Sequence, residues 1–279
     1  MRTLSRRHFL GAMGWAAPAL QLAADPLGLP IGCQTYPVRQ ALGKDFPGTL
    51  KELAGIGYQT IEMCSPAGYA KAGYGPLASL KGSEIRQTIQ AAGLHCESSH
   101  FNFRELKDNL DERIAWAKDV GLKQMVCSTF GVKPEAPLAD WSRAADELNK
   151  IAEQVHKAGL ALGFHNHNFE FAQVDGVLVY DHLMSRLDAK LVRMQFQVSV
   201  IGLGYEAATY FKKYPGRFIS IHLQDWSAAE KKPVAIGKGM VDWPALFRAA
   251  KVAGVKNYFV ELDLDALKES YPYLHNLKV

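Results

Sequence analysis

The sequence has few of the features that mark a membrane protein or a nucleic-acid-binding protein. The apolar run over residues 14–20 is much shorter than the roughly 20 residues that a membrane span needs. The chain holds 32 basic and 28 acidic residues, and the basic set includes Arg2, Arg6 and Arg7 near the N-terminus. Without these three the charges nearly balance, and no basic stripe remains. We therefore expect neither nucleic acid nor, once the N-terminal segment is removed, a membrane among its partners.

Cysteine is also scarce. The four cysteines, Cys33, Cys64, Cys96 and Cys127, lie 31, 32 and 31 residues apart, and each falls within a β-like run. This spacing is too wide for a zinc ribbon. In an oxidising compartment four cysteines can form two disulfides, but their places in strand-like runs favour buried free thiols.

The first 24 residues have the pattern of an export signal. Ser5-Arg6-Arg7-His8-Phe9-Leu10 is a twin-arginine signature, and the short apolar run that follows ends in small residues at Ala23-Ala24. The pattern predicts a twin-arginine signal peptide over residues 1–24 and a bacterial periplasmic location for the mature chain. An ordinary amphipathic N-terminal helix is the alternative.

A pattern of a helix, a glycine and then a strand recurs along the rest of the chain. Five helical stretches end at Gly57, Gly93, Gly121, Gly159 and Gly254, and a β-branched or aromatic run follows each of them. Glycine after a helix suits the left-handed C′ position. Further strand-like runs at 31–36, 191–198 and 218–223 bring the number of strands to eight. This repeat predicts a single-domain α/β fold over residues 25–279, a (β/α)8 TIM barrel. A doubly wound open sheet is the alternative, but no Gly-x-Gly-x-x-Gly motif follows the first strand.

Side-chain alternation sorts the two faces of each predicted strand. In a barrel the outward face meets helices and is apolar, so the polar residues between them point inward. In the run at 218–223, for example, Ile219, Ile221 and Leu223 are expected to point outward. The residues expected to point inward are Gln34, Tyr36, Glu62, Ser98, His100, His165, His167, Arg193, Gln195, Gln197, Ser199, Ser220, His222, Gln224, Phe259, Glu261 and Asp263.

Burying so many ionisable groups is costly unless they pair or bind a cation. The set therefore predicts a functional site at the C-terminal mouth, where barrel enzymes place their chemistry. A purely structural hydrogen-bonded network is the alternative.

Five motifs carry a resemblance to a known family. They are Gly163-Phe-His165-Asn-His167-Asn-Phe-Glu170-Phe171, Tyr214-Pro-Gly-Arg-Phe218, Ile221-His222-Leu-Gln-Asp225, Gly237-Lys-Gly239-Met-Val-Asp242-Trp243 and Tyr258-Phe-Val-Glu261. With these motifs the chain resembles the sugar phosphate isomerase/epimerase family, the xylose isomerase-like TIM barrels, and in particular its secreted twin-arginine members. The resemblance covers nearly all of the mature chain.

The resemblance implies a divalent metal, which the family holds with Glu, Asp, His and Glu at the ends of strands five to eight. The matching residues here are His165, Gln197, His222 and Glu261. They supply one negative charge where the usual set supplies three. Mn²⁺, Zn²⁺, Co²⁺ or Fe²⁺ is therefore favoured over Mg²⁺. Because Gln197 stands where Asp is usual, we expect metal binding to be weak or absent.

The resemblance also implies the reaction: removal of a proton next to a carbonyl of a free or oxidised (keto) sugar or glycoside, giving isomerisation or epimerisation. Glu261 is the expected base, with His165 or His167 as its catalytic partner. Substrate-binding residues are expected to be Gln34, Tyr36, Glu62, His100, Glu170, Gln224, Trp226 and Lys238. Lys238 can instead face solvent, and Trp243 can form a stacking wall with Trp226 or simply belong to the core.

Three other functions are weighed against this one. A lyase or hydratase acting on keto-glycosides would use the same enediolate chemistry. A non-catalytic carbohydrate-binding barrel with a degenerate metal site is favoured by Gln197. Phosphodiester cleavage of the endonuclease IV kind shares the fold, but the chain lacks the many ligands that a trinuclear zinc site needs. In the first two, as in the favoured function, the partner is a small-molecule carbohydrate.

Overall fold

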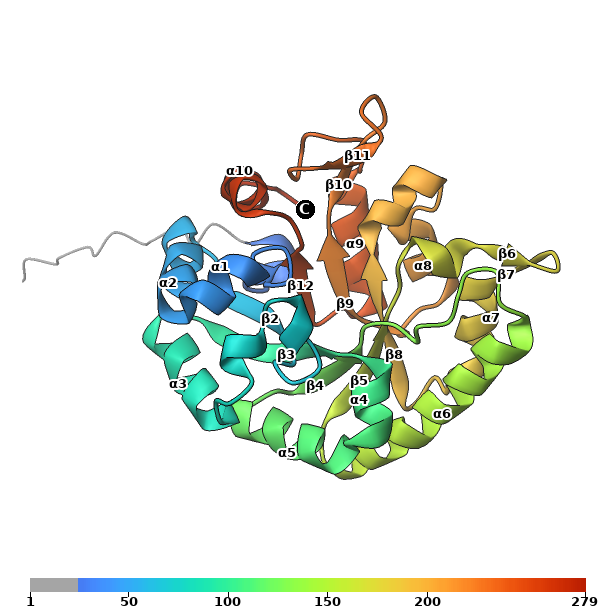
Figure 1. Ribbon diagram of the computed structural model, residues 1–279. Helices are drawn as coiled ribbons and strands as arrows, with labels where there is room; N and C mark the ends of the chain where they lie inside the picture. The colour runs from blue at the N-terminus through green and yellow to red at the C-terminus, as the bar shows by residue number, and fades with distance from the viewer. Residues whose placement is uncertain (1–24) are drawn as a thin grey trace, which may run out of the picture.

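Eight parallel strands close into a barrel at the centre of the molecule (Figure 1). The computed structural model describes residues 25–279, so the predicted signal peptide lies outside the described residues. In order around the barrel the strands are β1 (Gly32–Gln34), β12 (Asn257–Val260), β9 (Phe218–Leu223), β8 (Val192–Gln197), β5 (Ala161–His165), β4 (Gln124–Cys127), β3 (His95–Phe101) and β2 (Thr60–Cys64). Every neighbouring pair is parallel. The predicted (β/α)8 barrel is confirmed.

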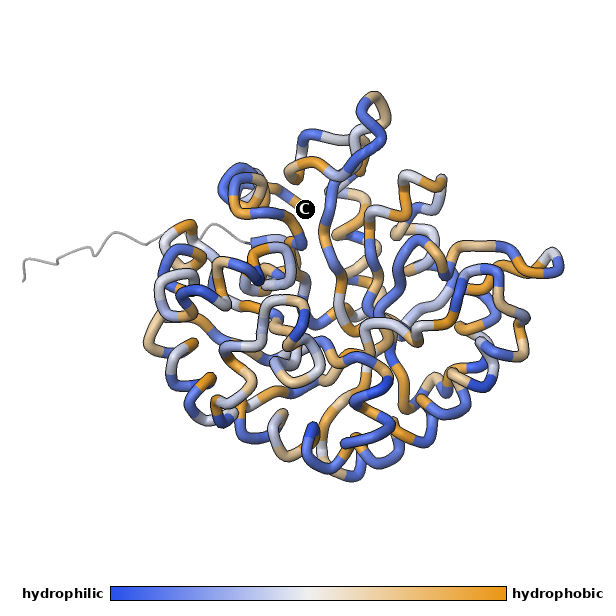
Figure 2. The backbone as a smooth tube through the Cα atoms, viewed as in Figure 1, coloured by the Kyte–Doolittle hydropathy of each residue, from blue (hydrophilic) through white to orange (hydrophobic). Residues whose placement is uncertain are grey.

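Helices surround the barrel because each parallel connection must return along its outside. They are α1 (Arg39–Lys44), α2 (Phe46–Ile56), α3 (Gly82–Ala91), α4 (Phe103–Asp108), α5 (Leu110–Val120), α6 (Leu138–Lys157), α7 (Val179–Arg186), α8 (Ala207–Lys213), α9 (Trp243–Ala253) and α10 (Leu264–His275). Two short hairpins, β6 (Gln173–Val174) with β7 (Val177–Leu178) and β10 (Asp225–Ser227) with β11 (Lys232–Val234), extend from the barrel. Figure 2 shows hydrophilic and hydrophobic residues alternating along the outer helices, as expected where one face meets the barrel.

The glycines that were expected to end helices have the predicted backbone conformation. All five have positive φ, from 75° at Gly254 to 124° at Gly57. Gly57 is also required by packing, because an added Cβ would collide with the ring of Tyr271. These residues let the chain leave each helix and turn directly into the next strand.

The main core lies between the outward faces of the strands and the helices. Phe164 of β5 stacks on Phe130 with ring centroids 4.3 Å apart, and Phe196 of β8 lies 5.7 Å from Phe211 of α8. Trp243 is fully buried at the start of α9, so its role is in the core rather than in a stacking wall. Aromatic contacts of this kind fix how the helices sit against the barrel.

The expectation that Ile219 points outward is wrong. A Cβ on Gly163 of β5 would lie 3.7 Å from Cγ2 of Ile219, and β8 separates β5 from β9, so the two residues meet inside the barrel. Phe218 packs outward on Phe211 instead, with ring centroids 4.7 Å apart. The cause is a register shift in the β8–β9 pairing, which interrupts strict alternation between Phe218 and Ser220.

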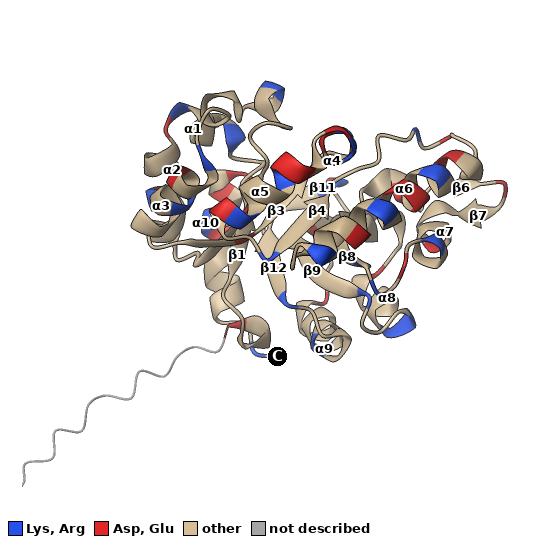
Figure 3. Ribbon diagram, turned by 90° about the horizontal axis from the view of Figure 1, so that it is seen from below, with Lys and Arg blue, Asp and Glu red and all other residues tan. Residues whose placement is uncertain are grey.

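The surface and the cysteines largely follow the sequence predictions. Figure 3 shows acidic and basic residues interspersed over the outer helices. Among residues 25–279, no helix combines the length and the apolar character that crossing a bilayer requires. All four cysteines are free thiols, and three are buried, whereas Cys96 is partly exposed.

Candidate active site

A cavity of about 760 Å³ opens at the C-terminal ends of the barrel strands. This volume lies within the range of about 300–1,000 Å³ that is typical of small-molecule sites. Eight of the predicted site residues line it: Tyr36, His100, His165, His167, Gln197, Gln224, Trp226 and Glu261. Each lies at the end of a strand or just after one, because the carboxyl ends of parallel strands meet at one edge of the barrel. The predicted mouth is therefore where the cavity lies.

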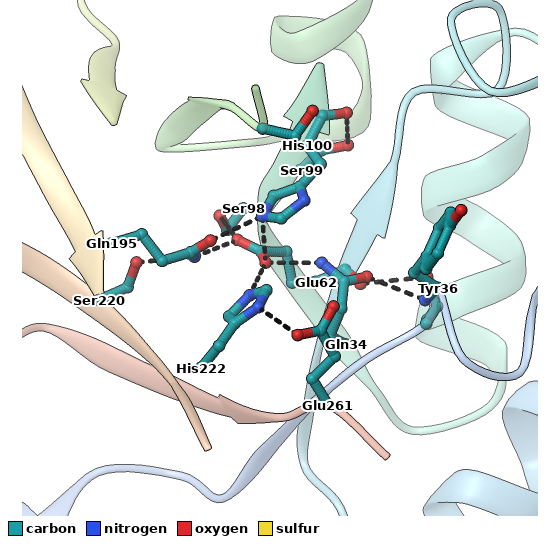
Figure 4. A network of polar contacts seen from close by, with 12 residues as sticks. Gln34, Tyr36, Glu62, Ser98, Ser99, His100, Gln195, Ser220, His222 and Glu261 are labelled. Carbon is teal, nitrogen blue, oxygen red and sulfur yellow. Dashed lines mark hydrogen bonds and ion pairs between the residues drawn. The ribbon is translucent and has the colours of Figure 1, made fainter. Parts of the chain in front are cut away.

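Glu62 lies beneath this cavity, at the centre of a buried network (Figure 4). Its Oε1 accepts hydrogen bonds from Ser98 Oγ and from Gln195 Nε2, the latter at 2.9 Å. Its Oε2 lies 2.7 Å from Gln34 Nε2 and 2.5 Å from His222 Nε2. Burial alone would raise the pKa of Glu62, but His100 and His222 outweigh it and hold the pKa well below the usual range. Glu62 and Gln34, both predicted to bind substrate, do not line the cavity.

His222 joins this buried network to the cavity. Its Nε2 faces Glu62, and its Nδ1 lies 3.2 Å from Glu261 Oε2. Burial opposes a charge on the ring, but the carboxylates of Glu261 and Glu62 raise its pKa above the ordinary histidine value. Both ring nitrogens of His222 therefore face carboxylates, which favour the charged form of the ring.

Glu261 is the carboxylate of the cavity. Its side chain is 15% exposed, and its Oε2 accepts a hydrogen bond of 2.5 Å from Gln197 Nε2 as well as the contact from His222. Burial favours the protonated acid, but His222 outweighs it, so the pKa of Glu261 is lowered and the group is ionised. Within the described residues, Oε1 of Glu261 has no hydrogen-bond partner. That oxygen is available to a ligand.

Three histidines converge at the base of the cavity. One ring nitrogen from each of His100, His165 and His222 lies within 4.8 Å of those of the other two. Burial, with the neighbouring histidines, lowers the pKa of His165 well below its usual value, so His165 is neutral. His100 was predicted to bind substrate, and sequence reasoning did not assign it to a metal, because the family pattern has no ligand on the third strand.

The donor atoms fit a divalent metal. His165 Nδ1 and Gln197 Oε1 are buried and have no hydrogen-bond partner within the described residues. Buried polar atoms are rarely left unpaired, and an imidazole nitrogen and an amide oxygen are both usable metal ligands. His100, His165 and His222 would hold such an ion, with Gln197 and Glu261 of the predicted set beside them. Imidazole-rich sets of this kind suit Zn²⁺, Mn²⁺, Co²⁺ or Fe²⁺ better than Mg²⁺.

His167 and Glu170 form a second unit at the cavity wall. Burial lowers the pKa of His167 to about 4, so its imidazole is neutral, and its ring stacks on Phe169 with centroids 4.9 Å apart. The backbone N–H of His167 donates to Glu170 Oε2 at 2.6 Å. Glu170, predicted to bind substrate, is fully buried behind the cavity, and burial raises its pKa to about 8.

Asp225 holds together the segments at the edge of the cavity. It is fully buried and accepts hydrogen bonds from the backbone N–H groups of Trp226, Gly237 and Val241 and from the indole of Trp243. These bonds hold the β10–β11 hairpin, whose Trp226 and Pro233 line the cavity. Lys238, which follows Gly237, was predicted to bind substrate but is exposed and does not line the cavity.

Some lining residues were not predicted, and one predicted residue lies elsewhere. Arg39, Tyr69, Ser128, Thr129, Asn168 and Phe169 line the cavity from loops and short helices that follow the strands. Alternation does not extend into such segments, so the only available signal was position shortly after a strand. Asp263, expected to point inward, is exposed and caps α10 by accepting a hydrogen bond from Ala266 N. The chain has already left the strand at that point.

A (β/α)8 barrel with histidines and a carboxylate at its mouth defines the class of protein. The chain belongs to the xylose isomerase-like TIM barrel family, whose model matches residues 50–272. A curated relative, the inosose dehydratase of Lacticaseibacillus casei, is 25% identical over an alignment of 170 residues, and the match covers 54% of this chain and 56% of the relative. The chain thus matches about half of that relative's length.

Solved structures have the same fold. The chain is similar to a sugar phosphate isomerase/epimerase from Parabacteroides distasonis, with a TM-score of 0.77, 21% identity and coverage of 96% of this chain and 98% of that one. It is also similar to the 3-keto-D-glucoside 4-epimerase of E. coli, with a TM-score of 0.62, 15% identity and coverage of 89% and 100%. Isomerases, epimerases and a dehydratase are therefore among the proteins that this chain resembles.

Proposed function

We propose that the protein is a metal-dependent sugar isomerase or epimerase that removes a proton next to the carbonyl of a free or oxidised (keto) sugar or glycoside. One observation carries the proposal: Glu261 is an ionised carboxylate that lines the same cavity as the neutral imidazoles of His165 and His167. Groups in these protonation states are the ones that general acid–base catalysis uses.

Glu261 Oε1 is the atom that accepts the substrate proton. The other oxygen is held by His222 and Gln197, which fixes the plane of the carboxylate and keeps it ionised. A base held in this way approaches a bound C–H bond without first reorienting. After the transfer, His222 remains beside Oε2 and favours return of the carboxylate to its charged form.

His165 or His167 moves the second proton. A neutral imidazole has one N–H donor and one acceptor nitrogen, so it can donate to the carbonyl oxygen or return a proton to carbon. His167 is held in place by the bond from its backbone to Glu170 and by stacking on Phe169. When bound, a divalent metal supplies positive charge that stabilises the oxyanion developing at the carbonyl.

Deuterium exchange tests the proposal. The mature chain, supplied in turn with Mn²⁺, Co²⁺ and Zn²⁺, is incubated in D₂O with fructose, tagatose and a 3-keto-glucoside, and NMR follows the C–H protons next to the carbonyl. We expect metal-dependent exchange, which Glu261→Gln lowers by about 10²–10⁴-fold while sugar binding stays measurable. Metal content below a tenth of an equivalent, with no exchange after metal addition, would leave a non-catalytic carbohydrate-binding barrel as the function.

Elimination is the second candidate reaction. It is favoured by the similarity to a dehydratase and by a cavity that pairs an ionised carboxylate with two neutral imidazoles, because a lyase needs a base for the proton and an acid for the leaving group. The same NMR experiment separates the outcomes. A lyase removes the proton next to the carbonyl of the 3-keto-glucoside and releases the group on the following carbon, which leaves a double bond, and a hydratase adds water across that double bond. An isomerase or epimerase conserves the composition of the 3-keto-glucoside.

We also propose a periplasmic location, on the strength of Arg6-Arg7 and the segment that follows. Fractionation of a bacterial host that expresses the full chain tests this. The protein is expected in the periplasm, and replacing both arginines by lysine is expected to retain it in the cytoplasm. A cytoplasmic wild-type chain would overturn the proposed location without affecting the chemistry.

A further inference from the structure

Arg39 is a cation at the cavity wall that the proposed chemistry does not use. Among the described residues it is the one lysine or arginine that lines the cavity. Its guanidinium carbon lies 4.1 Å from the centroid of the Tyr36 ring, and its Nη1 donates to the backbone oxygen of Tyr36 at 2.7 Å. The stacking and the hydrogen bond together fix the plane of the guanidinium.

The charge of Arg39 has no protein counterpart. None of the ion pairs formed within residues 25–279 includes it. Its Nε is buried and has no hydrogen-bond partner there, and only Nη1 is engaged. The edge formed by Nε and Nη2 is therefore unsatisfied. This edge has the spacing of a planar carboxylate, which accepts two parallel N–H bonds from it.

We infer that Arg39 is the subsite for a carboxylate on the ligand, so that the cavity takes an acidic sugar such as a uronic acid or its glycoside. The inference rests on the proposed function in placing a sugar in this cavity. Tyr36 stacks on Arg39, and Tyr69 lies edge-on to Tyr36 with centroids 6.0 Å apart. These rings line the same wall and offer apolar surface to a sugar ring whose carboxylate meets the guanidinium.

The number of positive charges on the cavity wall favours a carboxylate over a phosphate as the group that Arg39 binds. A phosphate monoester carries about −1.5 to −2 charges at neutral pH, whereas a carboxylate carries one. The cavity provides one guanidinium and no lysine among its described lining residues. A single negative charge matches this wall, and a phosphate would leave part of its charge without a partner.

Direct binding tests the inference independently of turnover. Calorimetry of the mature chain, with the metal that it retains on purification, uses D-glucuronic acid, D-glucose and glucose 6-phosphate as probes. We expect glucuronic acid to bind at least about tenfold more tightly than glucose, the effect of one charge-assisted contact. Arg39→Gln is expected to bring this ratio close to one. Arg39→Lys is expected to keep part of it, because the charge remains while the planar edge is lost.

Arg248→Gln is the matched control, since Arg248 is exposed on α9 and its removal changes the net charge equally. It should keep the wild-type ratio. Equal binding of glucuronic acid and glucose by the wild type, tighter binding of glucose 6-phosphate, no binding of any probe, or an unchanged ratio in Arg39→Gln would each overturn the inference. If Arg39→Gln fails to fold, the ratio of glucuronic acid affinity to glucose affinity in the wild type and in Arg39→Lys still tests the inference.

The wild-type deuterium-exchange assay keeps the two proposals separate. Exchange without a preference for the acidic sugar overturns the carboxylate subsite alone. A preference for the acidic sugar, with no exchange on either the neutral sugars or a keto-uronic acid, leaves the subsite intact and overturns the proposed enzyme.

Discussion

The buried network around Glu62, which forms the floor beneath the cavity, and the cavity itself are built from the same residue types. They differ in how many of their polar atoms have hydrogen-bond partners. In the floor, both oxygens of Glu62 accept hydrogen bonds, and the donors come from four different strands. In the cavity, His165 Nδ1, Gln197 Oε1 and Arg39 Nε are buried without partners in the described chain. A fully hydrogen-bonded buried network makes a structure rigid, whereas unpaired buried groups beside a cavity can receive hydrogen bonds or coordination from a ligand. The comparison thus separates a structural network from a binding site within one barrel.

The largest effect is expected from breaking the floor. Glu62→Ala leaves the donors of Gln34 and His222 buried without an acceptor, and loss of one partner from a buried charged network costs about 3–5 kcal/mol. Urea unfolding of the metal-free protein measures the change in the free energy of unfolding. Glu97→Ala, which removes an exposed carboxylate paired with Lys123, is the control and should cost less than about 1 kcal/mol. A similar small cost for Glu62→Ala would mean that the floor is not a structural network.

The next effect concerns Glu170, which is buried behind the cavity wall. Burial raises its pKa to about 8, so the folded protein holds a proton that the unfolded chain releases above about pH 4.5. Stability therefore falls as pH rises from about 4.5 towards 8, by up to about 1.4 kcal/mol per pH unit. Glu170→Gln removes this slope and should gain stability relative to the wild type as pH rises.

Unfolding midpoints of Glu170→Gln and wild type, taken at several pH values, measure the difference. Glu206→Gln, at an exposed carboxylate before α8, is the control for loss of one acidic group. Parallel pH profiles for wild type and Glu170→Gln would show that Glu170 is already ionised in the folded protein.

The smallest effect is expected from a substitution in the cavity, at Gln197. Gln197→Asp adds a carboxylate where Gln197 now donates to Glu261, so the two acids repel each other unless a cation lies between them. We expect metal affinity to rise by about tenfold, equivalent to about 1.4 kcal/mol, and the metal-free variant to be less stable. Competition with a chelator measures the affinity. Gln197→Asn, which keeps an amide, is the control, and unchanged affinity in Gln197→Asp would place Gln197 away from the metal.

The repeat of helix, glycine and strand predicted the fold, and alternation predicted which side chains face the barrel interior, but not how deep each one lies. It pointed Glu62 and Glu261 to the same interior, yet one lies under the cavity and the other at its wall, because depth depends on where each residue lies along its strand. The rule failed at Ile219, where a register shift interrupts the strand, and at Asp263, where the strand has ended. Arg39 was not found because it follows β1 in a helix, where the two-residue period no longer applies.

The four hydrogen bonds on Asp225 have a consequence for how this protein can diversify. They anchor both ends of the β10–β11 segment to the start of α9, so the exposed tip between Ser227 and Lys232 carries none of the anchoring contacts. Changes of length or sequence at the tip can reshape the entrance while the barrel below keeps its geometry. Evolution, or an engineer, can therefore alter which ligand enters the cavity without rebuilding the residues at its base.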